Sequence, residues 1–179
     1  IPNAMASGRA TTFDELLQLQ LGMCMMKTQT RQETPYPMHA VDLMPFQQAL
    51  PFSLTEGQQH AIAEIQESLN GSVPMKRLLQ GDVGSGKTIV ALLTMLNAVE
   101  CGTQAAIMAP TEILAKQHLE TIQPLCDEIG VRAELLTGRV KGKARTQILE
   151  ALAAGEIDIL IGTHALFVED VVFKDLACV

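Results

Sequence analysis

The chain has 179 residues, of which 47% are hydrophobic, and this is enough for one globular domain with its own core. Its formal net charge of −7 excludes a surface that binds nucleic acid over its whole area, because neutralising phosphates requires clustered lysine and arginine. The sequence has neither a long uncharged apolar run nor a signal-like start. We therefore expect a cytoplasmic protein without a membrane partner.

The first third of the chain predicts two helices separated by a proline-rich stretch. Apolar residues repeat at helical spacing over residues 13–26, which predicts an amphipathic helix. Four prolines between residues 28 and 52 predict an extended connector. Thr55 and Gln58 form a capping box, so we expect the second helix to begin there and to end near Asn70.

From residue 76 onward, short apolar runs alternate with longer helical patterns. The predicted strands cover residues 76–80, 104–109, 131–136 and 157–162, and the predicted helices cover 87–100, 112–129 and 141–154. This alternation predicts an α/β fold in which a parallel sheet carries helices on both faces. The last four residues, 176–179, resemble the start of one more strand.

Residues 81–88, GDVGSGKT, match the pattern G-x-x-x-x-G-K-[ST] between a predicted strand and a predicted helix. The glycines let the loop turn its backbone N–H groups toward one anion, and the helix presents the positive end of its dipole there. We expect Lys87 to reach the β- and γ-phosphates of ATP and the Thr88 hydroxyl to bind Mg²⁺, so both are candidate catalytic residues. The candidate nucleotide-binding residues are Gly81, Asp82, Val83, Gly84, Ser85, Gly86, Lys87 and Thr88.

A phosphate-binding loop does not by itself name a reaction, since kinases, GTPases, transporters and motors all use one. The sequence has no NKxD segment to recognise guanine and no LSGGQ-like segment typical of ABC transporters. A small-molecule kinase or GTPase, and a docking module with a vestigial loop, remain the alternatives from other classes.

Five segments together resemble the motor domain of the RecG family of superfamily 2 helicases in their order and spacing. They are LPFSLTEGQQHAIAEI (50–65), PMKRLLQGDVGSGKTIVAL (74–92), APTEILAKQH (109–118), LLTGR (135–139) and IGTHAL (161–166). The resemblance implies a RecA-like P-loop domain over 53–179, a connector over 29–52, and over 1–28 a helical linker from a DNA-binding wedge domain. It also implies that Gln58 recognises adenine, whereas the alternative is that Gln58 only completes the capping box.

The last three segments contact the tracked DNA strand in that family. The resemblance assigns this contact to Pro110, Thr111, Glu112, Thr137, Gly138, Arg139, Thr163 and His164. Each segment follows a predicted strand, and ligands of open α/β sheets bind at the carboxyl ends of the strands. Thr111 and Glu112 have an alternative role as a helix cap and a first-turn acid. The basic cluster over residues 139–145 either faces DNA or is merely solvated.

The resemblance implies an ATP- and Mg²⁺-dependent DNA helicase or translocase. It would act as a monomer on branched double-stranded DNA, reversing replication forks and migrating Holliday junctions in recombination and repair. A transcription-repair coupling translocase has a similar motor and is the alternative. We expect the sequence to stop before the family's DExH-type box, so this chain should bind ATP weakly and hydrolyse it negligibly.

Overall fold

The computed structural model describes residues 13, 15–23 and 38–179. The chain divides into two compact units, one of residues Ile1–Pro35 with Ser72–Pro74 and one of Tyr36–Gly71 with Met75–Val179. In the first unit, residues 15–23 are helical, which confirms that part of the helix predicted over 13–26. Its remainder, and the connector residues 29–37, lie outside the described residues. No helix in the described part of the chain combines the length and apolar character that membrane crossing requires.

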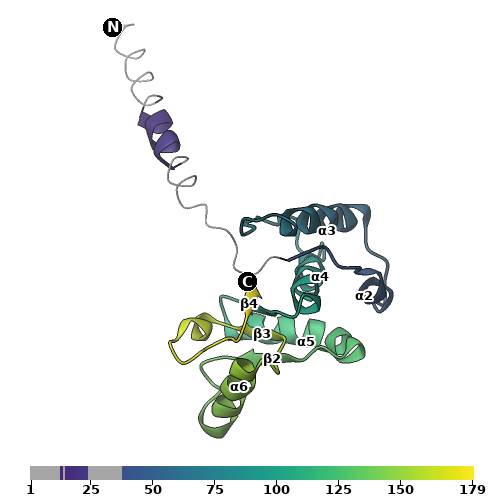
Figure 1. Cartoon of the computed structure of the whole chain (residues 1–179), viewed down its shortest axis with the longest axis vertical. Coiled ribbons are helices and arrows are strands. Elements are labelled where there is room, and N and C mark those ends of the chain that lie inside the picture. Colours follow the sequence, from purple (N-terminus) through teal and green to yellow (C-terminus); the bar gives the residue numbers. More distant parts are fainter. Residues whose placement is uncertain (1–12, 14, 24–37) are drawn as a thin grey trace, which may run out of the picture. The chain divides into compact units, whose positions relative to one another are not determined.

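The second unit contains a four-stranded parallel sheet in the order β2-β3-β1-β4 (Figure 1). The strands are β1 (Gln104–Met108), β2 (Ala133–Leu136), β3 (Ile159–Gly162) and β4 (Leu176–Cys178). Helix α5 (Glu112–Ile129) connects β1 to β2, and α6 (Gly142–Ala154) connects β2 to β3. The predicted parallel α/β architecture is confirmed, and so is the strand expected near the last residues.

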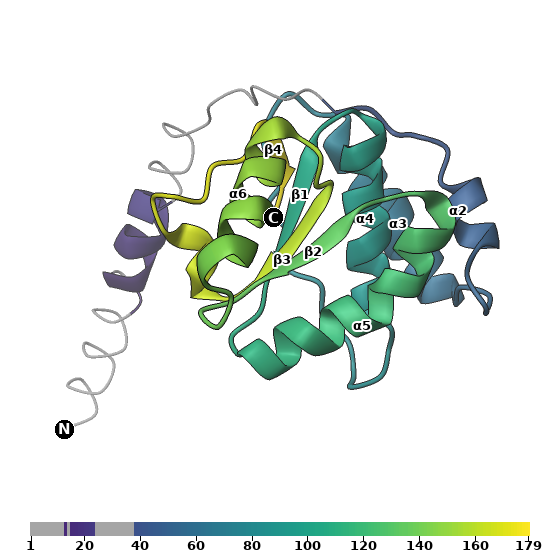
Figure 2. The ribbon, with the colours of Figure 1, turned by 90° about the horizontal axis from the view of Figure 1, so that it is seen from below.

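Helices cover both faces of this sheet, as Figures 1 and 2 show. Because strand side chains alternate between faces, Ile159 and Ile161 of β3 join the core formed with α4 (Lys87–Glu100) and α5. Leu160, between them, packs on the opposite face with Leu152 of α6. Helix α3 (Glu56–Leu69) packs against α4 on the side away from the sheet. The helix α4 is therefore enclosed between two layers, in agreement with its almost uniformly apolar sequence.

The strand predicted at 76–80 is wrong, since residues 74–82 form no strand and Leu78 is 82% exposed. An apolar run becomes a strand only when a neighbouring strand satisfies its backbone N–H and C=O groups. Within the described residues β4 pairs with β1, and nothing pairs with this run. Arg77 ties the run to α3 instead, through Glu64 (2.7 Å from Nη1) and the Ser68 hydroxyl (2.7 Å from Nη2).

The expectation of an extended connector is wrong for Met44–Gln48, which form the short helix α2. Proline is compatible with the first turn of a helix, because the N–H that it lacks has no partner there anyway, and Pro45 occupies such a position. Leu43 and Leu50, on either side of α2, are buried in the core. Residues ahead of position 53 thus pack against the domain that was predicted to begin there.

Candidate nucleotide site and strand-end edge

The loop over residues 81–86 leads directly into α4. Gly84 and Gly86 have φ angles of 82° and 77°, in the left-handed region that favours glycine. Gly86 is also the N-cap residue of α4, and Val83 at the tip of the loop is fully exposed. The loop closes on itself through Ser85 N–H, which donates to the Asp82 carbonyl at 3.2 Å. The local sequence thus produces the tight turn that the motif predicts.

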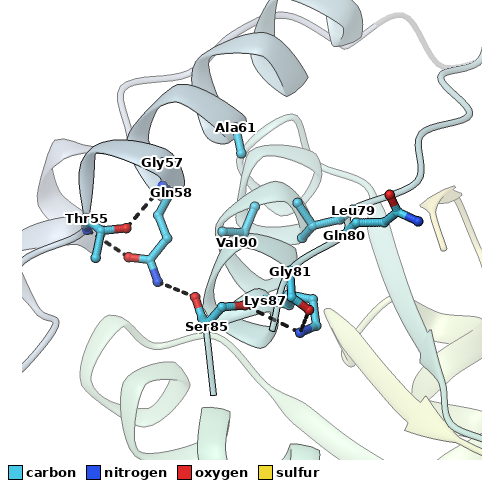
Figure 3. A pocket seen from close by; sticks show the side chains of 10 residues that line it. All are labelled: Thr55, Gly57, Gln58, Ala61, Leu79, Gln80, Gly81, Ser85, Lys87 and Val90. Carbon is cyan, nitrogen blue, oxygen red and sulfur yellow. Dashed lines mark hydrogen bonds between the residues drawn. The ribbon is translucent and has the colours of Figure 1, made fainter. Parts of the chain in front are cut away.

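Lys87 lies in the concave side of this loop. Its Nζ donates to the Gly81 carbonyl at 2.8 Å and to the Asp82 carbonyl at 2.7 Å, and it lies 3.4 Å from Ser85 Oγ (Figure 3). Phosphate oxygens that approached Nζ would compete with these two carbonyls. The ammonium group therefore has the position and the charge needed to bind an anion at the start of α4.

Gln58 links α3 to the nucleotide loop with a single amide group. Its Oε1 accepts from Thr55 N–H at 2.9 Å, while the Thr55 hydroxyl accepts from Gln58 N–H at 3.3 Å, which confirms the capping box. Its Nε2 donates to the Ser85 carbonyl at 2.9 Å. The cap is therefore established, and adenine recognition by the same side chain stays a prediction.

A cavity of about 240 Å³ lies between the first turn of α3 and the loop (Figure 3). Its polar lining includes Gln58, Ser85 and Lys87, which were expected from the sequence, together with Thr55 of the capping box and Gln80, which was not expected. Its apolar lining includes Ala61 and Leu79, which carried no signal in the sequence because any packed helix or apolar run offers such residues. The combination of an apolar wall and a few polar groups is typical of a site for a small organic ligand.

The predicted metal ligand Thr88 is half-buried in the first turn of α4. It stands one residue after Lys87, beside the loop that the phosphates would occupy, so its hydroxyl fits a shared Mg²⁺ ligand. Across residues 38–179, no three His, Cys, Asp or Glu side chains gather as a metal-binding cluster of their own.

The start of α4 and the carboxyl end of β1 lie at the same edge of the sheet. Only three residues separate the end of α4 at Glu100 from the start of β1 at Gln104, and the two elements pack together. A short connection between packed elements makes them antiparallel, so the first turn of α4 lies toward the end of β1. The nucleotide loop therefore belongs to this carboxyl edge.

Three predicted DNA-contacting segments meet at this edge as well. They follow β1, β2 and β3, and because these strands are parallel and β3 lies between the other two, their ends are adjacent. The Ala109 N–H donates to the Gly162 carbonyl at 2.8 Å and so joins the ends of β1 and β3. The structure thus brings the three segments together, as the sequence predicted.

The eight residues of these segments differ in what they expose. Pro110, Thr111, Gly138, Arg139 and His164 are exposed, and Glu112 is half-buried. Thr137 and Thr163 are only 4% and 2% exposed, so their side chains are buried in the domain and do not face solvent at this edge.

Thr111 also performs the alternative role that was left open for it. Its hydroxyl accepts from Leu114 N–H at 3.3 Å and so caps α5.

The basic cluster over residues 139–145 does not act as one group. Arg145 makes a bidentate contact with the Asp170 carboxylate, 2.9 Å from Nη2 and 3.2 Å from Nε, and only 22% of the Arg145 side chain is exposed. This hydrogen bonding lowers the pKa of Asp170. Arg139, in contrast, is 89% exposed and pairs with Glu112 through Nε at 2.8 Å. Lys141 and Lys143 are exposed.

Comparisons with known proteins agree with this geometry. The family model described as DEAD/DEAH box helicase matches residues 55–179. An ATP-dependent DNA helicase RecG from Pasteurella multocida (strain Pm70) is 45% identical over 93% of this chain and 24% of the relative's length. Its counterpart from Bacillus subtilis (strain 168) is 45% identical over 96% of this chain and 26% of its own length.

A solved structure, of RecG bound to a three-way DNA junction, superimposes on this chain with a TM-score of 0.80 at 39% identity. It covers 92% of this chain and 23% of that one. The chain therefore spans about a quarter of the length of the curated relatives that it matches. Since the family model covers the whole region from the capping box through the nucleotide loop to the last strand, the chain belongs to the DEAD/DEAH box helicases.

Proposed function

We propose that this chain is the nucleotide-binding lobe of an ATP- and Mg²⁺-dependent DNA helicase or translocase that acts on branched double-stranded DNA. The observation that carries the proposal is the meeting of the nucleotide loop and three strand-end segments at one edge of the sheet. A motor needs this arrangement, because a conformational change at the bound phosphates must be transmitted to the groups that bind the DNA.

The nucleotide part of the proposal assigns a role to each element of the loop. Lys87 binds the β- and γ-phosphates, the backbone N–H groups of residues 84–88 surround them, and Gln58 recognises the adenine. The Thr88 hydroxyl would be one ligand of Mg²⁺, which when bound would neutralise part of the phosphate charge. The contacts of Lys87 with the loop carbonyls and of Gln58 with Ser85 support these roles, since both side chains already line one cavity.

The DNA part of the proposal concerns the exposed groups along the strand ends. Hydroxyl, backbone N–H and guanidinium groups suit phosphate contacts that position a duplex without recognising its sequence. We propose that the whole protein uses them to reverse stalled forks and to migrate Holliday junctions, in the cytoplasm and as a monomer. The structure of RecG on a three-way junction supports branched DNA as the substrate class.

Nucleotide selectivity tests the first part. The purified chain, titrated with a fluorescent ATP analogue in magnesium buffer, should bind it, and unlabelled ATP should displace it far better than GTP. Absence of binding, or a preference for GTP, would make a helicase assignment untenable for this site.

A further inference from the structure

An ion pair connects two strand-end segments that do not touch through the sheet. Glu112 is the first residue of α5, after β1, and Arg139 is the third residue after β2. Strand β3 lies between β1 and β2, so the pair spans two strand spacings, about 10 Å in total. The Glu112 carboxylate lies 3.7 Å from the place where a Cβ on Gly138 would stand, so Glu112 reaches the segment that follows β2, at the edge proposed to contact DNA.

The two partners are held with different strength. The carboxylate of Glu112 is fixed at the start of α5, where Thr111 caps the helix and the helix dipole favours a negative charge. Arg139 contacts this carboxylate at 2.8 Å from Nε, is 89% exposed, and has no second acidic partner within 4 Å among the described residues. The Arg145–Asp170 pair shows the opposite case, with two contacts and a side chain only 22% exposed. Arg139 is thus held loosely enough to change partners, whereas Arg145 is fixed.

A carboxylate at a DNA-contacting edge requires an explanation, because it repels phosphates. We propose that Glu112 is a positioning residue that competes with DNA phosphates for the guanidinium of Arg139. Without DNA, Glu112 holds the guanidinium of Arg139, and when a duplex arrives, Arg139 transfers from the carboxylate to a phosphate. This inference rests on the proposed function, since it requires that the strand-end edge contacts DNA.

A double-mutant cycle on the full 179-residue chain tests the competition. The affinity for a fluorescently labelled linear duplex is measured for wild type, Glu112→Gln, Arg139→Ala and the double variant at low salt. Glu112→Gln should raise the affinity about two- to fivefold, the scale of one exposed ion pair. In the Arg139→Ala background the same substitution should leave the affinity unchanged or raise it less. The gain should also shrink as salt rises, because screening weakens exposed ion pairs.

Two controls isolate the effect. Glu120→Gln removes another α5 carboxylate, which is exposed and pairs with Lys116 at 3.6 Å, and it should leave DNA affinity unchanged. Thermal unfolding of every variant checks that the fold persists, with a small loss expected for Glu112→Gln because the helix start loses a favourable charge.

Each remaining outcome overturns the inference in a distinct way. An equal gain in both backgrounds would mean that Glu112 only repels phosphates. A loss of affinity in Glu112→Gln would mean that the carboxylate orients Arg139 for DNA rather than competing for it. If no variant binds duplex at low salt, the DNA part of the proposed function fails together with the inference. ATP-analogue binding would then show that the nucleotide part stands separately.

Discussion

The nucleotide loop and the strand-end edge lie on the same side of the sheet, but they are built differently. The strand ends continue a paired sheet, and buried Thr137 and Thr163 support them from below. The loop follows residues 74–82, which pair with no strand in the described part of the chain, and the contacts of Lys87 and Gln58 tie it to its surroundings. The difference implies that the half of the edge proposed to contact DNA is preformed, whereas the nucleotide half depends on two half-buried side chains, Lys87 and Gln58, that a ligand can recruit.

The largest effect should come from breaking the framework of the sheet at Gln104, which begins β1 at the opposite end from the strand-end edge. This side chain is 5% exposed, accepts from the N–H groups of Lys174 and Asp175, and donates to the carbonyls of Leu152 and Ile157. Gln104→Leu removes the amide from two buried carbonyls and two partly buried N–H groups, so urea unfolding followed by circular dichroism should show a loss of about 2–3 kcal/mol.

Gln117→Leu is the matched control for this prediction, because Gln117 lies exposed on α5. It should change the free energy of unfolding by no more than about 0.5 kcal/mol. A similar loss in both variants would mean that the buried amide adds nothing beyond the general cost of the substitution.

Gln104 also shows what the sequence does not reveal. A glutamine at the start of an apolar strand looks like a solvated end residue, and its four partners come from segments far away in the chain. The same holds for Asn97, buried in α4, whose amide joins the backbone of His39 and Val41 to the core. Contacts of this kind depend on tertiary packing, and no local pattern encodes them.

Local signals, in contrast, predicted most of the elements. Thr55 and Thr111 marked the starts of α3 and α5, and the alternation of apolar runs with helical patterns located β1, β2 and β3. The strand at 76–80 failed, since pairing is a long-range property that an apolar run alone cannot establish. The Glu112–Arg139 pair was also out of reach, because it depends on the strand order β2-β3-β1.

Breaking the nucleotide half of the edge should affect binding rather than stability. Lys87→Ala removes the ammonium group proposed to bind the phosphates, so affinity for the ATP analogue should fall on the order of 10- to 100-fold. The free energy of unfolding should change by less than about 1 kcal/mol, since the contacts of Lys87 with the loop are exposed.

Lys116→Ala, which removes an exposed lysine from α5, should preserve nucleotide affinity. Unchanged binding in Lys87→Ala would remove the reason to place the phosphates in this loop.

Gln58→Ala tests both stability and nucleotide binding, because the Gln58 side chain caps α3 and also contacts the nucleotide loop. The variant loses half of the capping box and the hydrogen bond to the Ser85 carbonyl, so the free energy of unfolding should fall by about 1 kcal/mol.

If Gln58 recognises adenine, the variant should bind ATP less tightly, while its affinity for inorganic triphosphate, measured by the same competition, changes little. Gln59→Ala, which removes a neighbouring amide that donates to Leu54, should spare both affinities. Equal losses for the two ligands would indicate that Gln58 only shapes the loop.

The smallest effect should come from Asp170→Asn, which tests whether the Arg145–Asp170 pair is a fixed part of the framework. The hydrogen bond from Arg145 lowers the pKa of Asp170 in the folded protein, so the carboxylate stabilises the fold at pH values above the usual pKa of an aspartate. This stabilisation disappears as the pH falls through the lowered pKa. Urea unfolding should therefore show wild type slightly more stable than Asp170→Asn at neutral pH and equal to it in strong acid. A difference that persists in acid would mean that the side chain acts through packing instead of charge.

Because Arg145 stays paired in the wild type while Arg139 exchanges, DNA affinity should respond to Glu112→Gln and not to Asp170→Asn.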